Sequence, residues 1–302
     1  MGFAAHAAIA ILLMLGSLLG DCSPGKVLHR APSLERCIEQ TLASQPAFHV
    51  VYQDVLGEGP EAWDPDPRYP TYQVNCIVWL QYVLAETFAC QGLDNDQSMD
   101  AIRYFGGVPS FATRKHFVDS WLAIEPGPLS VLDSQACKPD ASMEIRLDFA
   151  RFRMSNGFPC KLAEETDKPL KIDYLSRERF SQCSDALPGG FYVFFGVASE
   201  KYLERWGRSS GPMAQVHGFL LHQAHNKNAA IVHHASIVKA KVVSSSLSRL
   251  LAETADLYRG FTIFRIREDT GWVKGLDPLS VDASCEQSIP TGRKDPFSEA
   301  LR

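Results

Sequence analysis

The 302-residue chain lacks several features that would place it in a common functional class. It has no C-x-x-C pair, which argues against a ribbon-type zinc site and a thioredoxin-like redox site. It has no basic excess, because its formal net charge is -5, so nucleic acid is not an expected partner. After the N-terminus it has no apolar run long enough to span a bilayer, so no membrane span is expected in the mature chain.

The N-terminus does carry an apolar segment of the length of a signal peptide. Residues 7–19 form the apolar core, although no Lys or Arg precedes them and no clear A-x-A cleavage site follows. We predict a signal peptide over residues 1–22 and a periplasmic or secreted protein. The alternative is a lipoprotein anchored to the membrane through Cys22.

The chain contains eight cysteines. Cys22 belongs to the leader, and Cys76 stands apart because it falls between a proline-rich loop and an apolar run. The remaining six are Cys37, Cys90, Cys137, Cys160, Cys183 and Cys285. An even remainder in an oxidising compartment permits disulfides, but the sequence does not give their connectivity.

The N-terminal third predicts helices separated by loops. A serine-capped helix is expected over residues 33–44, and residues 57–70 hold four prolines and two glycines and so form a loop. From Cys76 onward, apolar residues recur on one helical face up to a predicted end near Gly92. A further helical segment is expected over residues 96–105.

The second half of the chain is rich in strand signals. β-Branched and aromatic runs occupy residues 189–199, 216–223, 229–236 and 260–268. A Ser-capped helix is expected over residues 244–260. In the less informative middle, residues 144–154 alternate charged and apolar side chains like a half-exposed strand. Helices first and strands later predict an α+β domain, with a helical layer packed on an antiparallel sheet.

Two histidines fall on neighbouring predicted strands. If the hairpin centre lies between His225 and Asn226, then His217 lies opposite His234 and both rings share one face of the sheet. Two imidazoles converging on a cysteine at a helix N-terminus would supply a base and an orienting group for a nucleophile. The helix N-terminus and a neighbouring imidazolium would both favour the thiolate. We therefore expect an ionised Cys76 beside this histidine pair.

These segments resemble the NlpC-type papain-like cysteine hydrolases of bacterial cell walls. Members carry Asp-Cys at the head of a helix, His-x-Gly on a strand and His-Ala-Ser on the next strand. The corresponding residues are Asn75-Cys76, "HGF" at 217–219 and "HAS" at 234–236. The branch most similar was first catalogued as a domain of unknown function and consists of N-acetylmuramoyl-L-alanine amidases. Its Ile-Arg-Tyr and Arg-x-His-aromatic segments resemble "IRYFGGVPSFATRKHFVDSW" at 102–121.

The resemblance implies a papain-like fold, a peptidoglycan or muropeptide substrate and no cofactor. It implies that Cys76 is the nucleophile, that His217 is the base and that His234 orients it. The residues that it implies for substrate binding are Tyr72, Asn75, Arg114, His116 and Trp121. Asn75 departs from the family's aspartate, which puts substrate choice in doubt. The family's Gly-Asp before a strand is replaced by Gly189-Gly190.

Three other readings stay open. A D-glutamyl-diaminoacyl stem-peptide endopeptidase would keep the same triad, and a wall-binding protein of this fold would have lost catalysis. A zinc site from the strand histidines is disfavoured, because residues 205–252 contain no Asp or Glu and the spacing fits no standard pattern.

The expected organisation of the chain follows from these segments. It consists of the signal peptide, an N-terminal helix and loop (23–68), a papain-like cysteine hydrolase domain (69–270) and a loosely ordered C-terminal tail (271–302).

Overall fold

The structure is a computed structural model. All the residues that it describes lie in one compact unit, residues 32–302. The described ranges are 32–51, 73–109, 114–115, 127–145, 169–204, 215–225 and 230–274. The predicted signal peptide and most of the predicted C-terminal tail lie outside them.

Polar side chains begin the helices. Ser33 accepts a hydrogen bond from the Arg36 N–H at the start of α2, and Asp94 accepts one from Gln97 at the start of α4. The helical elements are α2 (Leu34–Ser44), α3 (Cys76–Cys90), α4 (Asn95–Arg103), η1 (Phe105–Gly107), η2 (Gln135–Cys137), α7 (Arg177–Ala186), α9 (Leu247–Glu253) and α10 (Gly271–Lys274). The predicted helices over 33–44, after Cys76 and over 96–105 are confirmed within one or two residues.

The strands of the described chain form one ten-stranded sheet in the order β2-β1-β9-β8-β7-β6-β10-β5-β4, with β3 also paired to β10. Their bounds are β1 (His49–Val50), β2 (Gln73–Val74), β3 (Leu129–Val131), β4 (Ala141–Ile145), β5 (Leu170–Ser176), β6 (Gly190–Ala198), β7 (Gln215–Gln223), β8 (Ala230–Ser236), β9 (Lys241–Ser246) and β10 (Tyr258–Ile266). Neighbouring strands are antiparallel except for β1 with β2. The four predicted strand runs of the second half are confirmed.

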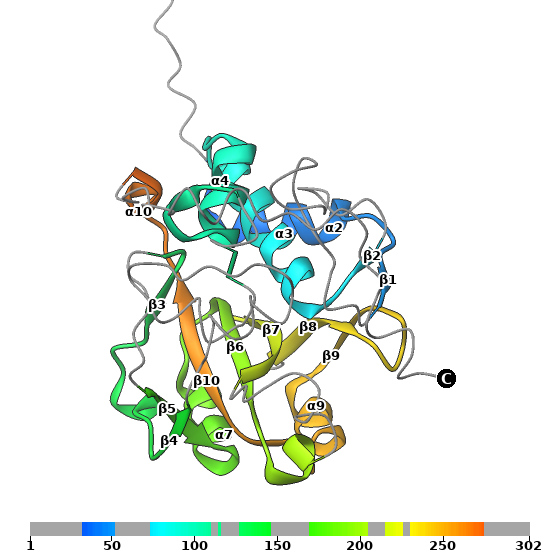
Figure 1. Cartoon of the computed structure of the whole chain (residues 1–302), viewed down its shortest axis with the longest axis vertical. Coiled ribbons are helices and arrows are strands. Elements are labelled where there is room, and N and C mark those ends of the chain that lie inside the picture. Colours follow the sequence, from blue (N-terminus) through cyan, green and yellow to red (C-terminus); the bar gives the residue numbers. More distant parts are fainter. Residues whose placement is uncertain are drawn as a thin grey trace, which may run out of the picture. The chain divides into compact units, whose positions relative to one another are not determined.

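Both faces of the sheet carry helices, as the central strand β6 shows. All nine of its residues are buried. Val193 and Phe195 point to a first core shared with α2, α3 and α4, whereas Tyr192 and Phe194 point to a second core shared with α7 and α9. Figure 1 shows α2, α3 and α4 together beside one part of the sheet, and α7 and α9 elsewhere. The fold is therefore mixed α+β, with helices on two faces of the sheet, where the sequence predicted a single helical layer.

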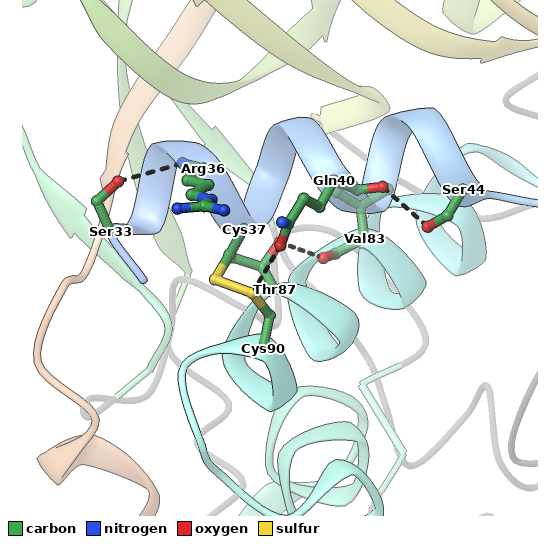
Figure 2. Close-up of a disulfide and its surroundings, with 8 residues drawn as sticks. All are labelled: Ser33, Arg36, Cys37, Gln40, Ser44, Val83, Thr87 and Cys90. Carbon is green, nitrogen blue, oxygen red and sulfur yellow. Dashed lines mark hydrogen bonds between the residues drawn. A yellow bond between two sulfur atoms is a disulfide. The ribbon is translucent and has the colours of Figure 1, made fainter. Parts of the chain in front are cut away.

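Two disulfides within the described residues join helical elements. They are Cys37–Cys90 and Cys137–Cys183. Figure 2 shows the first, which ties α2 to the last residue of α3. The second ties η2 to α7. Because α3 begins with Cys76, the first disulfide helps to fix the helix that carries this cysteine.

The structure corrects two predicted segments at the C-terminal end. The helix expected over 244–260 is limited to α9, because residues 244–246 belong to β9 and Gly260 lies in β10. The Ser246 side chain caps α9 by accepting from the Arg249 N–H, which fixes the later start. The tail expected to be loose from residue 271 begins with α10, whose Trp272 is buried in the first core.

The end of α9 is held by one arginine from another helix. The Arg177 guanidinium donates to the carbonyls of Leu251, Thr254 and Tyr258, and it lies 5.9 Å from the centre of the Phe261 ring. We expect Arg177→Ala to lower the free energy of unfolding by about 2–3 kcal/mol, since several charge-assisted hydrogen bonds to carbonyls are lost together. Urea denaturation measures this change.

Arg249→Ala is the matched control for that variant, because Arg249 makes only an exposed i,i+4 pair with Glu253. Its expected cost is much smaller than that of Arg177→Ala, because an exposed ion pair contributes little to stability. Equal costs for the two variants would contradict the role given to Arg177.

Candidate active site

Cys76 is the first residue of α3, directly after a strong cap. The Asn75 Oδ1 accepts from the N–H groups of Ile77 and Val78, both at 2.9 Å. Cys76 is a free cysteine, partly buried and packed against the first core. The structure therefore excludes a disulfide at this position and confirms the predicted placement at a helix N-terminus.

The Cys76 thiol is protonated at neutral pH. Burial raises its pKa to about 11, and this effect outweighs the lowering by backbone hydrogen bonds from Gly218, Cys76 and Ile77. The expectation of a thiolate in the resting protein is wrong. The helix N-terminus does favour the anion, but removing the sulfur from water has the larger effect.

His217 and His234 lie together as the sequence predicted. The His217 Nε2 and His234 Nδ1 are 3.0 Å apart, and one hydrogen joins them. Their predicted register is wrong by two residues, because Leu220 opposes His233 and the hairpin centre falls one residue later in the chain. A shift of two residues keeps both rings on one face, since side chains alternate with a period of two.

Both imidazoles of this pair are neutral at neutral pH. Burial, and then the proximity of His234, lowers the pKa of His217 to about 3. Burial lowers the pKa of His234 to about 4, although Glu253 opposes this shift. With both rings neutral, the shared hydrogen lies on one ring nitrogen and the other nitrogen accepts it.

The Cys76 thiol lies against β7 at the residue next to His217. Cys76 interacts with the backbone of Gly218, the residue that follows His217. A Cβ at Gly218 would lie 3.2 Å from Leu80 of α3, so a glycine at this position lets the helix approach the strand closely. The pairs between β7 and β8 run from Leu220 to Gln223, and towards His217 the described parts of the two strands are not paired. The described parts of β7 and β8 are thus not paired at Gly218, the residue whose backbone interacts with the thiol.

The imidazole pair packs against the second core. Among the described residues, no hydrogen bond joins the Cys76 thiol to either histidine. Both rings contact Phe219 of the second core, with ring centroids 4.5 Å from His217 and 5.2 Å from His234. The structure therefore brings the two histidines together and places the thiol against the main chain beside them.

Asn75 has a structural role in the site. Because its side chain satisfies two N–H groups of α3, we expect Asn75→Ala to lower the free energy of unfolding by about 1 kcal/mol. Asn75→Asp keeps the cap and is the matched control, so it should unfold at the wild-type urea concentration at pH 7. An Asn75→Ala protein as stable as the wild type would show that the cap contributes nothing.

Of the residues expected to bind substrate, only Asn75 and Arg114 lie among the described residues. Arg114 is buried and forms an isolated antiparallel bridge with Tyr104, and the neighbouring Lys115 donates to the Ala101 carbonyl. Both side chains are buried, so they do not form an exposed pair of charges. Tyr72, His116 and Trp121 lie outside the described residues.

The described residues hold no group of three or more His, Cys, Asp or Glu side chains arranged to bind a metal ion. None of the described helices has the length and apolar character needed to cross a membrane.

Known proteins resemble this chain over the part that contains Cys76 and the two histidines. A family model described as AmiA-like, N-acetylmuramoyl-L-alanine amidase-like, matches residues 52–258. A Legionella pneumophila protein of the DUF1460 family has a TM-score of 0.60 and 17% identity, over 87% of this chain and 94% of that one. An N-acetylmuramoyl-L-alanine amidase of Bacteroides uniformis has a TM-score of 0.54 and 16% identity, over 78% of this chain and 99% of that one. No curated protein sequence matches. At these identities the structural likeness shows the fold.

Proposed function

Because the chain belongs to the AmiA-like family of N-acetylmuramoyl-L-alanine amidase-like proteins, we propose that it is a cysteine amidase of peptidoglycan fragments. It cleaves the amide between the lactyl group of N-acetylmuramic acid and L-alanine. The papain-like relationship and an extracytoplasmic location, with residues 1–22 as a signal peptide, are parts of the same proposal. The domain limits 23–68, 69–270 and 271–302 remain predictions.

The observation that carries the proposal is the position of one free thiol. Cys76 begins α3 and contacts the backbone of Gly218, next to a pair of hydrogen-bonded imidazoles. A nucleophile, a base and an orienting group come from one helix and two neighbouring strands. The Cys76 N–H can donate to the oxyanion, since the next two N–H groups are occupied by Asn75.

The protonation states at rest define the first step. The Cys76 sulfur attacks the lactyl carbonyl while the neutral His217 takes the thiol proton through Nδ1. Its Nε2–H donates to His234 Nδ1, which holds the ring in this tautomer. This step requires His217 to come within hydrogen-bond reach of the sulfur when substrate binds.

The later steps return every group to its starting state. The His217 imidazolium protonates the leaving amine of L-alanine, and the muramyl acyl group remains on sulfur as a thioester. His217 then takes a proton from water, which attacks the thioester and releases the carboxylic acid of muramic acid, and this acid loses its proton to solvent. The thiolate recovers the proton from His217, so one water is consumed for each bond cleaved.

Mass spectrometry of a purified disaccharide-pentapeptide tests the assignment of the bond. The amidase releases the intact stem peptide with a free L-alanine amine, together with the disaccharide. A product in which the disaccharide still carries the L-Ala–D-Glu dipeptide would instead identify a stem-peptide endopeptidase.

A second candidate is a wall-binding protein of the same fold without catalysis. The raised pKa of Cys76 and the contact of both imidazoles with the second core favour it. Fragment binding without turnover, unchanged in Cys76→Ala, would support this candidate and exclude the amidase.

A further inference from the structure

A polar patch continues the face of the sheet that α3 covers. Along this face, β8 and β9 pair residues in three rows, Ala235 with Val242, His233 with Ser244 and Ile231 with Ser246. The first row packs against the first core beneath the helices. In the next rows Ser244 and Ile231 are exposed and His233 is half-buried. On this face of the sheet, the row of Ala235 is covered by the helices, and the next two rows are accessible to solvent.

The accessible side chains in these rows have fixed positions. His233 Nδ1 and Ser244 Oγ are 2.8 Å apart and share a hydrogen bond. His222 of β7 lies on the same face, where its ring stacks on Phe191 with centroids 4.3 Å apart and planes within 12°. We call His222, His233 and Ser244 the His–Ser patch.

Within the patch, His233 and Ser244 offer hydrogen bonds without charge. Burial, and then the neighbouring His222, lowers the pKa of His233 to about 4, so its ring is neutral at neutral pH. Residues 205–252 contain no Asp or Glu. The neutral imidazole of His233 and the hydroxyl of Ser244 can both donate and accept hydrogen bonds. This chemistry suits hydroxyl and acetamido groups and gives no ion pair to a carboxylate.

We propose that the His–Ser patch binds the sugar hydroxyl and acetamido groups of the muropeptide disaccharide. This inference rests on the proposed amidase function, in which the attacked carbonyl is attached directly to a sugar. His233 stands two residues from Ala235, about 7 Å along β8, on the face packed against α3. A disaccharide whose lactyl carbonyl reaches Cys76 can extend over the next rows of this face.

The patch is tested without any catalytic step by an NMR titration. The titration measures binding of the peptide-free disaccharide GlcNAc-MurNAc to the Cys76→Ala protein. Adding Ser244→Ala or His233→Ala should weaken binding about tenfold, since each change removes a hydrogen-bonding group. Ser245→Ala is the matched control. It lies on the same strand with its side chain on the other face, opposite Val232, and should change the dissociation constant less than about twofold.

Equal binding by all these proteins, or no binding by any of them at millimolar sugar, would overturn the proposed patch. Either result is distinct from failure of the amidase assignment, which is decided by hydrolysis in the wild-type protein. Thermal melting of each variant shows whether a loss of binding reflects unfolding. Ser244 is exposed, so its replacement tests the patch even if His233→Ala is unstable.

Discussion

Cys76→Ala should abolish muropeptide hydrolysis, lowering kcat by at least about 10³-fold. The thiol is the attacking group in the proposed mechanism, and no other free cysteine occurs among the described residues. Removal of a nucleophile leaves only the acceleration that comes from substrate binding and the oxyanion donor. Product formation is measured by chromatography with mass detection, at a fixed enzyme concentration.

His217→Gln distinguishes the base from a mere neighbour of the thiol. It should lower kcat by about 10²–10⁴-fold and leave KM within a few-fold, because the imidazole acts in proton transfer. His225→Gln is the matched control, since His225 lies on the same hairpin and is mostly exposed. Wild-type kcat in His217→Gln would exclude the proposed base even if Cys76 proved essential.

The second large effect is a loss of stability in mild acid. The pKa values of His217, His233 and His234 are lowered to about 3, 4 and 4, whereas unfolded histidine titrates near 6.5. Between pH 6.5 and 4 the unfolded chain therefore binds more protons than the folded one, and stability falls as the pH falls. The expected slope is about 1.4 kcal/mol per pH unit for each of these histidines.

Urea denaturation at pH 7, 6 and 5 measures this slope. The double variant His217→Gln, His234→Gln should be less sensitive to acid by about two such contributions, because glutamine does not titrate. His225→Gln should keep the wild-type dependence. The same slope in the double variant and the wild type would show that the buried imidazoles are not kept neutral by the fold.

The helix that carries Cys76 and the strands that carry the histidines follow from local patterns. A polar cap before an apolar run defines α3, and β-branched or aromatic runs define β7 and β8. The prediction that His217 and His234 share one face of the sheet was correct although the predicted register was not. The register was wrong by two residues, an even number, which keeps each side chain on its face. An error of one residue would have placed the two rings on opposite faces.

What the sequence did not predict depends on contacts between distant segments. The protonated state of Cys76 results from its burial against the first core, whereas the helix N-terminus visible in the sequence acts in the opposite direction. Arg114 is buried where its backbone pairs with Tyr104, and no pattern in its own segment indicates this contact. The pairing of Cys37 with Cys90 needs α2 and α3 to pack side by side. Each of these features is set by tertiary packing.

The intact mass of the protein, taken after rapid acid quench of its reaction with a disaccharide-pentapeptide, tests the central claim most directly. A sulfur nucleophile predicts a protein species heavier by the acyl group of the disaccharide, with the adduct on Cys76 and absent from Cys76→Ala. Release of the stem peptide by Cys76→Ala, or an acyl group found on another residue, would contradict it.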